Sequence, residues 1–382
     1  DGDTPTLTYV WTNDDLGDVL GTSSTVDLDP SYAQPGETIT CTVTATDDDG
    51  GTGTDSDSVT VGNTAPVVTS VSITPSTAVT TTTSLTCTGT ATDDDEDTPT
   101  LAYTWTNEST ATTLGTGSVL DLSIATASPD DTITCSVTAT DEDGGSDSDS
   151  ASVIVDNTNP VVASVSITPG TGVGTSSSLV CTATATDEDG GTPTLAYTWF
   201  NASTEVALGT GTSLTLTSST SSPSDTITCS VTATDADGGT DEDSDSVTVS
   251  NTAPTMGSVS ITPSSGVTTS TTLTCATTAT DSDGDSPTLA YAWSNATEGT
   301  SLGTGGSLIL SAANSSPGDT ITCTATATDS DGGTASGDAS VVVGNTAPAI
   351  ASVSISPSSS IGTSTALTCS ASATDADGGT PT

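Results

Sequence analysis

The sequence contains no Lys, Arg or His, against 49 Asp and Glu residues, so its formal net charge at pH 7 is −49. A surface charged with this one sign repels nucleic acid and anionic membranes, and both are excluded as partners. The missing residue types also remove the usual catalytic bases, Schiff-base lysines and oxyanion-binding cations. Any cation that neutralises this surface must therefore come from outside the chain.

Aromatic residues make up 3% of the chain and hydrophobic residues 31%, which is thin for one large core but sufficient for several small ones. No apolar run approaches the ~20 residues of a membrane-spanning helix, so we expect no membrane insertion. Ser and Thr together account for 148 of the 382 residues. Thr alternates with apolar residues in many segments, which indicates β-strands rather than disorder.

A repeat of 94 residues organises the chain. The motif Asn-Thr-Ala-Pro begins at Asn63, Asn251 and Asn345, and Asn157 begins the variant Asn-Thr-Asn-Pro. Each start lies 94 residues after the previous one, and the eight cysteines alternate separations of 46 and 48 residues, which again sum to 94. We therefore predict complete repeats at 63–156, 157–250 and 251–344. Partial repeats are predicted at 1–62, without its first two strands, and at 345–382, with only those two.

The chain opens and closes within the same loop of the repeat, which leaves two interpretations. The sequence is either a segment of a longer continuous polypeptide, which we favour, or a subunit whose tail completes the head of the next through a Cys369–Cys41 bond. Joining residue 382 to residue 1 would duplicate six residues of the repeat. Such a duplication would not regenerate the 94-residue repeat, whereas a continuous polypeptide does not require it.

Each repeat reads as six or seven short strands. Residues 85–92 and 133–140 place Cys and apolar residues on one face and mostly Thr on the other, and Leu101, Tyr103 and Trp105 line an apolar face with period two. Pro, Gly and Asp-Gly turns separate these segments, and no segment of useful length shows a helical period. The prediction is an all-β chain of tandem immunoglobulin-like antiparallel β-sandwiches.

Three motifs carry a resemblance to a known group of domains: Ala-Thr-Asp-x-Asp-Gly, as at 185–190, the Leu-x-Tyr-x-Trp strand, and the Asn-Thr-Ala-Pro linker. On these motifs the repeats resemble the bacterial immunoglobulin-like, cadherin-like and PKD-type repeats of giant extracellular surface proteins. The Trp-Asp-Phe-Gly-Asp-Gly signature of true PKD domains is absent. The resemblance covers the whole chain and implies a structural or adhesive role at a cell surface.

The two cysteines of each complete repeat lie 48 residues apart, and both face inward, with a Trp between them. We predict the disulfides Cys87–Cys135, Cys181–Cys229 and Cys275–Cys323. Zinc sites need clustered ligands, and this chain offers neither the spacing nor any His. Disulfides form in oxidising compartments, so we expect an extracellular or cell-surface location.

Acidic loops of the form Asp-x-Asp-Gly, or a near variant, follow both cysteine strands of each repeat. In an immunoglobulin-type sandwich these two loops lie at the end that receives the preceding linker, where close carboxylates without counter-charges repel. A hard cation with oxygen ligands, Ca²⁺ above all, resolves this repulsion. The alternative is that Asp-Gly simply makes good turns on solvated loops. The predicted ligands are Asn63, Asp93, Asp95, Asp141, Asp143, Asn157, Asp187, Asp189, Asp235, Asp237, Asn251, Asp281, Asp283, Asp329 and Asp331.

Carbohydrate is a further hypothesis. Asn-x-Ser/Thr occurs at Asn107, Asn201, Asn295 and Asn314, although about four such sequences are expected from this composition alone. The outward Thr rows suit O-linked glycan or a polysaccharide ligand, but Thr also suits any exposed pleated face.

The function predicted from these features is a non-enzymatic structural shaft or filament segment, stiffened by disulfides and Ca²⁺. Its expected partners are neighbouring repeats of the same polymer, with self-association into a filament as an open possibility. The alternative is a Ca²⁺-dependent adhesin that binds glycan or another surface through its repeats. A glycosidase would need one unrepeated acidic pair in a cleft, whereas the carboxylates here recur in every repeat.

Overall fold

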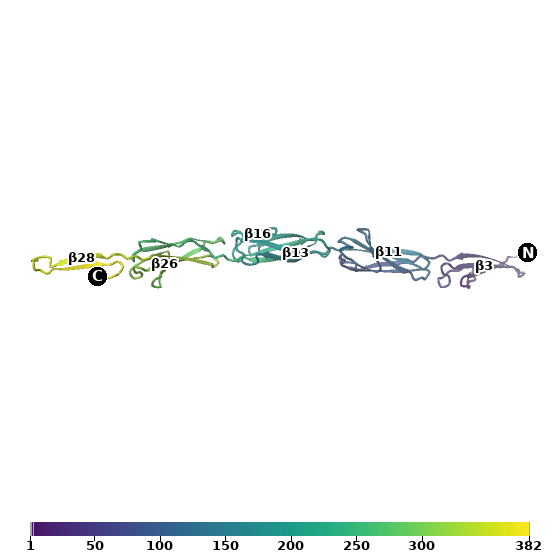
Figure 1. The fold of residues 1–382 in the computed structure, drawn as a ribbon. Helices are drawn as coiled ribbons and strands as arrows, with labels where there is room; N and C mark the ends of the chain where they lie inside the picture. The colour runs from purple at the N-terminus through teal and green to yellow at the C-terminus, as the bar shows by residue number, and fades with distance from the viewer. Residues whose placement is uncertain (1, 3, 382) are drawn as a thin grey trace. The chain divides into compact units, whose positions relative to one another are not determined.

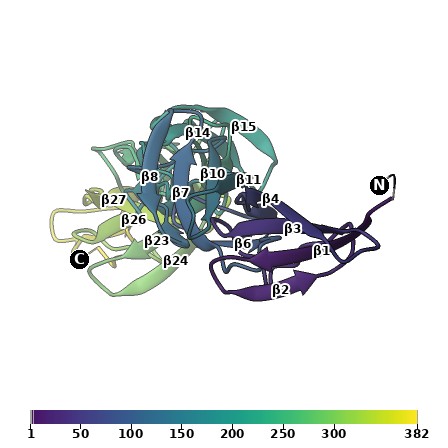
Figure 2. The same cartoon turned by 90° about the vertical axis from the view of Figure 1, so that its right-hand side faces the viewer.

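The computed structural model describes residue 2 and residues 4–381. Residues 1, 3 and 382, which fall in the predicted partial repeats 1–62 and 345–382, lie outside the described residues. All regular structure in the described part of the chain is β-strand, the named strands pair antiparallel, and one isolated parallel bridge joins Val173 and Val249 (Figures 1 and 2). The prediction of an all-β chain is confirmed. Among the described residues, no helix is long and apolar enough to cross a membrane.

The chain divides into two units whose limits differ from the predicted repeat boundaries. The first unit comprises residues 1–161 together with 185–194 and 233–241, and the second comprises 162–184, 195–232 and 242–382. The boundaries at 94-residue intervals therefore stay a prediction, and the names first, second and third repeat are used below for 63–156, 157–250 and 251–344.

The first unit contains the whole first repeat, which is built of two sheets. A three-stranded sheet has the order β5-β6-β9 and a four-stranded sheet the order β11-β10-β7-β8 (Figure 2). The strands are β5 (Val67–Thr74), β6 (Ser84–Thr92), β7 (Thr100–Asn107), β8 (Thr112–Thr116), β9 (Val119–Asp121), β10 (Thr132–Thr140) and β11 (Ser146–Ile154). Before it, a sheet of order β2-β1-β3-β4 is formed by β1 (Thr6–Asn13), β2 (Asp18–Gly21), β3 (Thr38–Thr46) and β4 (Thr52–Thr60).

The core of the first repeat lies between its two sheets. Leu85 and Cys87 of β6 are buried, as are Trp105 of β7 and Cys135 of β10, whereas the Thr residues between them on β6 are exposed. The period-two pattern in the sequence therefore sets which face of each strand is buried. Gly89 lets the sheets approach closely, because a Cβ at this position would stand 2.7 Å from a methyl carbon of Val137.

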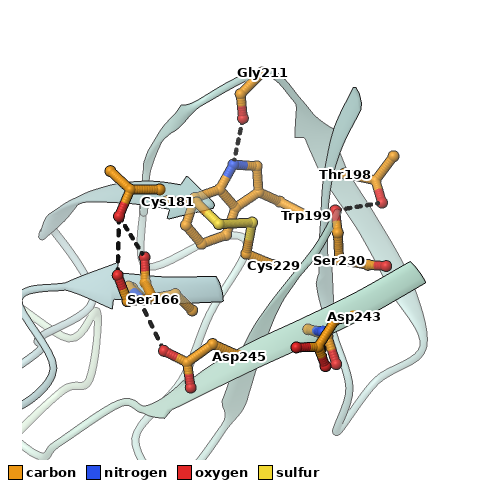
Figure 3. Close-up of a disulfide and its surroundings, with 12 residues drawn as sticks. Ser166, Cys181, Thr198, Trp199, Gly211, Cys229, Ser230, Asp243 and Asp245 are labelled. Carbon is orange, nitrogen blue, oxygen red and sulfur yellow. Dashed lines mark hydrogen bonds between the residues drawn. A yellow bond between two sulfur atoms is a disulfide. The ribbon is translucent and has the colours of Figure 1, made fainter. Parts of the chain in front are cut away.

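The second repeat has the sheet orders β12-β13-β16 and β15-β14-β17-β18. Its strands are β12 (Val161–Thr168), β13 (Ser178–Thr186), β14 (Thr194–Asn201), β15 (Val206–Thr210), β16 (Ser213–Thr215), β17 (Thr226–Thr234) and β18 (Thr240–Thr248). Figure 3 shows its core, where the Trp199 ring lies against the disulfide and Nε1 donates to the Gly211 carbonyl oxygen at 2.8 Å.

The second unit contains the whole third repeat, with sheet orders β20-β21-β25 and β24-β23-β26-β27 and a two-stranded sheet β19-β22. The strands are β19 (Thr255–Met256), β20 (Ser260–Thr262), β21 (Thr272–Ala276), β22 (Ala279–Thr280), β23 (Thr288–Asn295), β24 (Thr300–Thr304), β25 (Ser307–Ile309), β26 (Thr320–Thr328) and β27 (Thr334–Val342). A hairpin of β28 (Ala349–Ser356) and β29 (Thr368–Thr374) follows.

The third repeat differs from the first in its interrupted outer strands. Thr277 occupies the position of Gly89, two residues after the first cysteine of the repeat, and its hydroxyl donates to the Gly257 carbonyl oxygen at 3.0 Å. A backbone bond from the Gly257 N–H to the Thr278 carbonyl oxygen at 2.7 Å lies beside it, where the first repeat has a β-bulge between Val68 and Ser70. The long pair β5–β6 of the first repeat corresponds to two short pairs here, β20–β21 and β19–β22.

Candidate metal-binding junctions

All three predicted disulfides are formed. Cys87–Cys135, Cys181–Cys229 and Cys275–Cys323 have Cα–Cα distances of 6.4, 6.5 and 6.4 Å. Cys41 and Cys369, which belong to the partial repeats, are free thiols in the chain, the first half-buried and the second exposed.

The first Asp of each loop after the first cysteine strand shapes its own turn. Asp187 Oδ1 accepts a hydrogen bond from the Asp189 backbone N–H at 2.8 Å, and Asp281 Oδ1 accepts one from the Asp283 N–H at 2.7 Å. Asp93 and Asp375 bond in the same way to Asp95 and Asp377. In each of these residues one carboxylate oxygen fixes the loop, which leaves the other oxygen for a ligand.

The second Asp of the same loop joins two repeats. Thr81 Oγ1, in the first repeat, donates to Asp189 Oδ1 at 2.8 Å, and the linker N–H of Thr158 donates to Asp189 Oδ2. We call this three-residue arrangement the clamp. It recurs in the second unit as Thr175–Asp283–Thr252 and Thr269–Asp377–Thr346, with hydroxyl-to-carboxylate distances of 2.8 and 2.7 Å.

Each clamp threonine is enclosed, with exposed fractions of 0% for Thr81 and 1% for Thr175 and Thr269. A buried hydroxyl bonded to a carboxylate is held more strongly than one in water, because the charge strengthens the bond and water does not compete. The clamp therefore ties the preceding repeat, the linker and the following repeat together at one carboxylate. It is a structural link that the sequence analysis did not predict.

The loops after the second cysteine strand hold the linker asparagines. Nδ2 of Asn157 donates to Asp235 Oδ2 at 3.1 Å, while the Gly239 N–H donates to Oδ1 at 2.8 Å. The pairs Asn63–Asp141 and Asn251–Asp329 repeat this contact at 3.0 and 3.1 Å. The sequence predicted that linker Asn and loop Asp converge, and the structure brings them together.

These hydrogen bonds affect the acidity of the loop carboxylates. The Asn63 amide, which donates to Asp141, lowers the pKa of Asp141 below its ordinary value despite the burial of that group. Burial acts to raise the pKa of Asp235, but the bonds from Asn157 and Gly239 outweigh it, and the net pKa is lowered. Both carboxylates are therefore held in the charged form that a cation requires.

The two acidic loops of one repeat also meet each other. In the first repeat the pKa of Asp97 is raised, first by burial and then by the negative charges of Asp93 and Glu142. Asp93 belongs to one acidic loop and Glu142 to the other, so Asp97 is repelled by carboxylates of both loops. In the third repeat, Ser330 Oγ donates to Asp285 Oδ2 at 2.8 Å across the same gap. The predicted ligands Asp143, Asp237 and Asp331 are exposed.

Several buried oxygens at these junctions have no hydrogen-bond partner: Asp93 Oδ2, Asp281 Oδ2, Asn157 Oδ1, Thr158 Oγ1 and Thr346 Oγ1. All of them lie in the acidic loops or the linkers, and leaving a buried acceptor unpaired is costly. Carboxylate, amide, hydroxyl and backbone oxygens form the ligand set that Ca²⁺ takes. The donor chemistry therefore fits a hard cation, although within the described residues no three Asp, Glu, Cys or His side chains converge tightly enough to hold a metal alone.

The glycines of these loops leave space for the hydrogen-bonded Asp and Asn side chains, because any other residue would place a Cβ there. A Cβ at Gly239 would stand 2.3 Å from Asp235 Oδ2 and 2.7 Å from Asn157 Nδ2, and Gly145 and Gly333 have equivalent surroundings. The Asp–Asn contact thus depends on glycine at this position.

The asparagines of three predicted glycosylation sequences are not presented by the folded repeats. Asn107, Asn201 and Asn295 are at most 1% exposed, and their Nδ2 groups donate to Asp131, Asp225 and Asp319 at 2.7 Å. Glycan on Nδ2 would replace these bonds, so among the four predicted asparagines, all within the described residues, only Asn314 is partly exposed. The buried asparagines instead anchor the turn after their strand, which the sequence analysis missed.

No family model matches the chain, and no curated protein matches it. Similar solved structures include a tetra-tandem repeat from the extending region of a large adhesion protein, with 20% identity, 89% of this chain and 92% of that chain covered, and a TM-score of 0.33. A Ca²⁺-stabilised adhesin with which an Antarctic bacterium binds ice shows 18% identity, coverage of 89% and 90%, and a TM-score of 0.34. Cadherin domains 3–6 of protocadherin gamma B2 show 12% identity, coverage of 89% and 92%, and a TM-score of 0.29.

These neighbours are tandem repeats of large adhesins and immunoglobulin- and cadherin-like domains, the group that the sequence resembles. Scores and identities of this size carry no information about ligands.

Proposed function

We propose that this chain is a segment of an acidic extracellular repeat protein that acts as a structural shaft, and that Ca²⁺ bound at its junctions stiffens it. The observation that supports the proposal is the set of buried, unpartnered oxygens at the junctions of a chain with no Lys, Arg or His. No side chain of the protein can neutralise the carboxylates gathered there, so a cation from solution is needed.

At the junction before the second repeat, the ion would be held by Asp187, Asn157 and the linker hydroxyl of Thr158. The hydrogen bond from Asn157 Nδ2 to Asp235 would orient the asparagine. Bound Ca²⁺ would supply positive charge between loops that otherwise repel. Asp189 has a different part, because both of its carboxylate oxygens already accept hydrogen bonds in the clamp. We therefore propose that the clamp sets the approach of two repeats and that the cation locks it.

The similarity of the three complete repeats to one another supports a structural shaft over a protein that recognises a ligand. The three complete repeats have equal lengths and acidic loops at the same two places, and none carries an insertion that would form a separate binding site. Neighbouring repeats are thus the partners proposed for each repeat. The disulfides support an extracellular location, since they persist in oxidising compartments.

Hydrogen exchange with Ca²⁺ and with chelator tests this function. Chelation should speed exchange at the linker amides of Thr158, Thr252 and Thr346, and should leave the amides of β10 and β26 slow, because each sandwich keeps its disulfide. Equal exchange at the linker amides in both conditions would show that the acidic loops are solvated turns. Substituting Asp187→Asn should remove the Ca²⁺ effect at Thr158 only, and Asp243→Asn, on the exposed face of β18, should leave it unchanged.

A further inference from the structure

The first strand of each complete repeat lies at the edge of its sheet, and we call it the entry strand because the linker leads into it. In the first and second repeats it is continuous, as β5 and β12. In the third repeat it is divided into β19 and β20, and residues 257–259 lie between them outside any strand. An edge strand presents backbone N–H groups that have no ladder partner, so its stability depends on what else holds them.

Aspartates on the facing sheet hold the entry strands of the first two repeats. In the first repeat, Asp147 Oδ2 on β11 accepts a hydrogen bond from the Val68 N–H of β5 at 2.9 Å. In the second repeat, Asp245 Oδ2 on β18 accepts one from the Ile167 N–H of β12 at 2.9 Å (Asp245 is labelled in Figure 3). Each of these carboxylates ties the edge of one sheet to the edge of the other.

The third repeat has alanine at the corresponding places. Ala335 lies 188 residues after Asp147, and Ala339 lies 94 residues after Asp245, both on β27. An alanine side chain has no oxygen, so neither residue can accept a hydrogen bond from an N–H group of the entry strand. At both places, which the structure describes, the third entry strand is therefore without a carboxylate tie.

The outer face of the entry strand differs in the same direction. In the second repeat, Ser166 Oγ lies within hydrogen-bond distance of Thr182 Oγ1, at 2.9 Å across the strand pair. The corresponding residues of the third repeat are Ser260 and Ala276, and Ser260 Oγ donates to the Ala276 carbonyl oxygen at 3.2 Å instead. Because pairs of side chains across two strands add to the stability of a sheet, the third entry strand is held less firmly on its own sheet as well.

We propose that the entry strand of the third repeat is a strap, formed by residues 255–262, that detaches reversibly before the entry strands of the first and second repeats do. The disulfide Cys275–Cys323 limits this opening, because it joins β21 to β26 beyond the end of the strap. The strap contains none of the proposed Ca²⁺ ligands, so its opening does not rest on the proposed function.

In a shaft under tension, the strap would be the place where the third repeat lengthens. Load enters the repeat through linker residues 251–254 and passes into the strap, and it meets the disulfide at Cys275 once residues 255–274 are extended. Twenty residues span at most about 66–72 Å when fully extended. This mechanical role, unlike the opening itself, rests on the proposed function as a shaft.

Hydrogen exchange of the full chain in the presence of Ca²⁺ tests the opening. The amides to compare are Ser260 and Thr262, on either side of Ile261, and their counterparts Ser166 and Thr168 in the second repeat. Relative to intrinsic rates, the two amides of the strap should exchange faster than their counterparts. The amides of β26 should stay as slow as those of β10, because the opening does not reach the rest of the third repeat.

Returning the carboxylates to the third repeat should close the strap. Ala335→Asp together with Ala339→Asp should slow exchange at the strap amides about tenfold or more, because a hydrogen bond to a charged group is restored. The matched control is Ser336→Asp together with Ser340→Asp, which adds the same charge to the exposed face of β27 and should leave the exchange unchanged.

Removing a carboxylate should have the opposite effect, so Asp245→Ala should raise exchange at Ser166 and Thr168 by a similar factor. Equal exchange of the strap and of β12 in the unsubstituted chain would overturn the proposal, as would equal effects of the Ala-to-Asp and Ser-to-Asp pairs. If β26 exchanged as fast as the strap, the third repeat would be opening as a whole and the strap would be wrong. None of these outcomes depends on whether Ca²⁺ slows the linker amides.

Discussion

Replacing the clamp threonine Thr175 by Val tests how strongly the clamp holds two repeats together. Val has nearly the shape of Thr but lacks the hydroxyl that donates to Asp283 Oδ1 at 2.8 Å. Thr175 is 1% exposed and Asp283 6% exposed, so water cannot easily take the place of the lost donor. A hydrogen bond to a charged group contributes about 1.5–3 kcal/mol, and leaving the acceptor unpaired costs a similar amount. The equilibrium for opening this junction should therefore rise roughly 10- to 150-fold.

Hydrogen exchange read by mass spectrometry measures this opening directly. The Thr252 N–H donates to the same carboxylate as Thr175, so its exchange rate should rise by that factor, while the equivalent Thr346 N–H should not change. Pepsin is the suitable protease, because the chain has no Lys or Arg for trypsin. Thr272→Val, at an exposed position of β21, serves as the matched control. A change below about twofold at Thr252, or an equal change at Thr346, would refute the clamp as an energetic link.

Three further predictions concern the repeats themselves. Replacing Cys181 and Cys229 together by Ala should destabilise the second repeat by about 4 kcal/mol, since the bond closes a 48-residue loop, and should lower its calorimetric midpoint by roughly 15–30 °C; an unchanged midpoint would contradict this. Glu96 has a φ of 67° where the next repeat has Gly190 at 89°, so Glu96→Gly should stabilise the first repeat by about 1 kcal/mol and Gly190→Ala should destabilise the second, as measured by chemical unfolding. The pKa values of Asp141, Asp235 and Asp329 are lowered in the folded state. The stability that these carboxylates contribute is therefore complete above the unfolded pKa of about 3.9 and is lost as pH falls through the lower folded pKa. The exchange of the linker amides, relative to their intrinsic rates, should exceed that of the core amides only below about pH 4, and a loosening of the linkers already at pH 5–6 would contradict this assignment.

The strands and the disulfides could be predicted because they depend on patterns local to each repeat. Alternation around Leu85 and Cys87 marked the buried face of β6, and the 94-residue period showed that the same reasoning held in every repeat. The interruption of the third repeat could not be predicted in this way. At the interruption the Thr277 hydroxyl bonds to the Gly257 carbonyl oxygen, between β19 and β20, and a single-strand pattern does not contain such a contact between segments.

The candidate site was predicted only in part. Convergence of linker Asn and loop Asp followed from the expected topology, whereas the clamp joins residues 108 positions apart in two different repeats. One signal was present: Thr occurs at 81, 175, 269 and 363, while the flanking positions vary between Thr and Gly or Ser. The sequence also gave no means to tell that Asn107, Asn201 and Asn295 turn inward, because a glycosylation sequence reads the same on a buried and an exposed turn.

The number of Ca²⁺ ions bound per chain tests the central claim most directly. Three junctions contain the linker Asn and both acidic loops, those of Asn63, Asn157 and Asn251, so equilibrium dialysis at physiological ionic strength should find about three saturable ions per chain. Asp187→Asn should reduce the count by one, and Asp243→Asn should not. A chain that binds no Ca²⁺ saturably, or loses equal amounts with either substitution, would contradict the account of the junctions as cation sites.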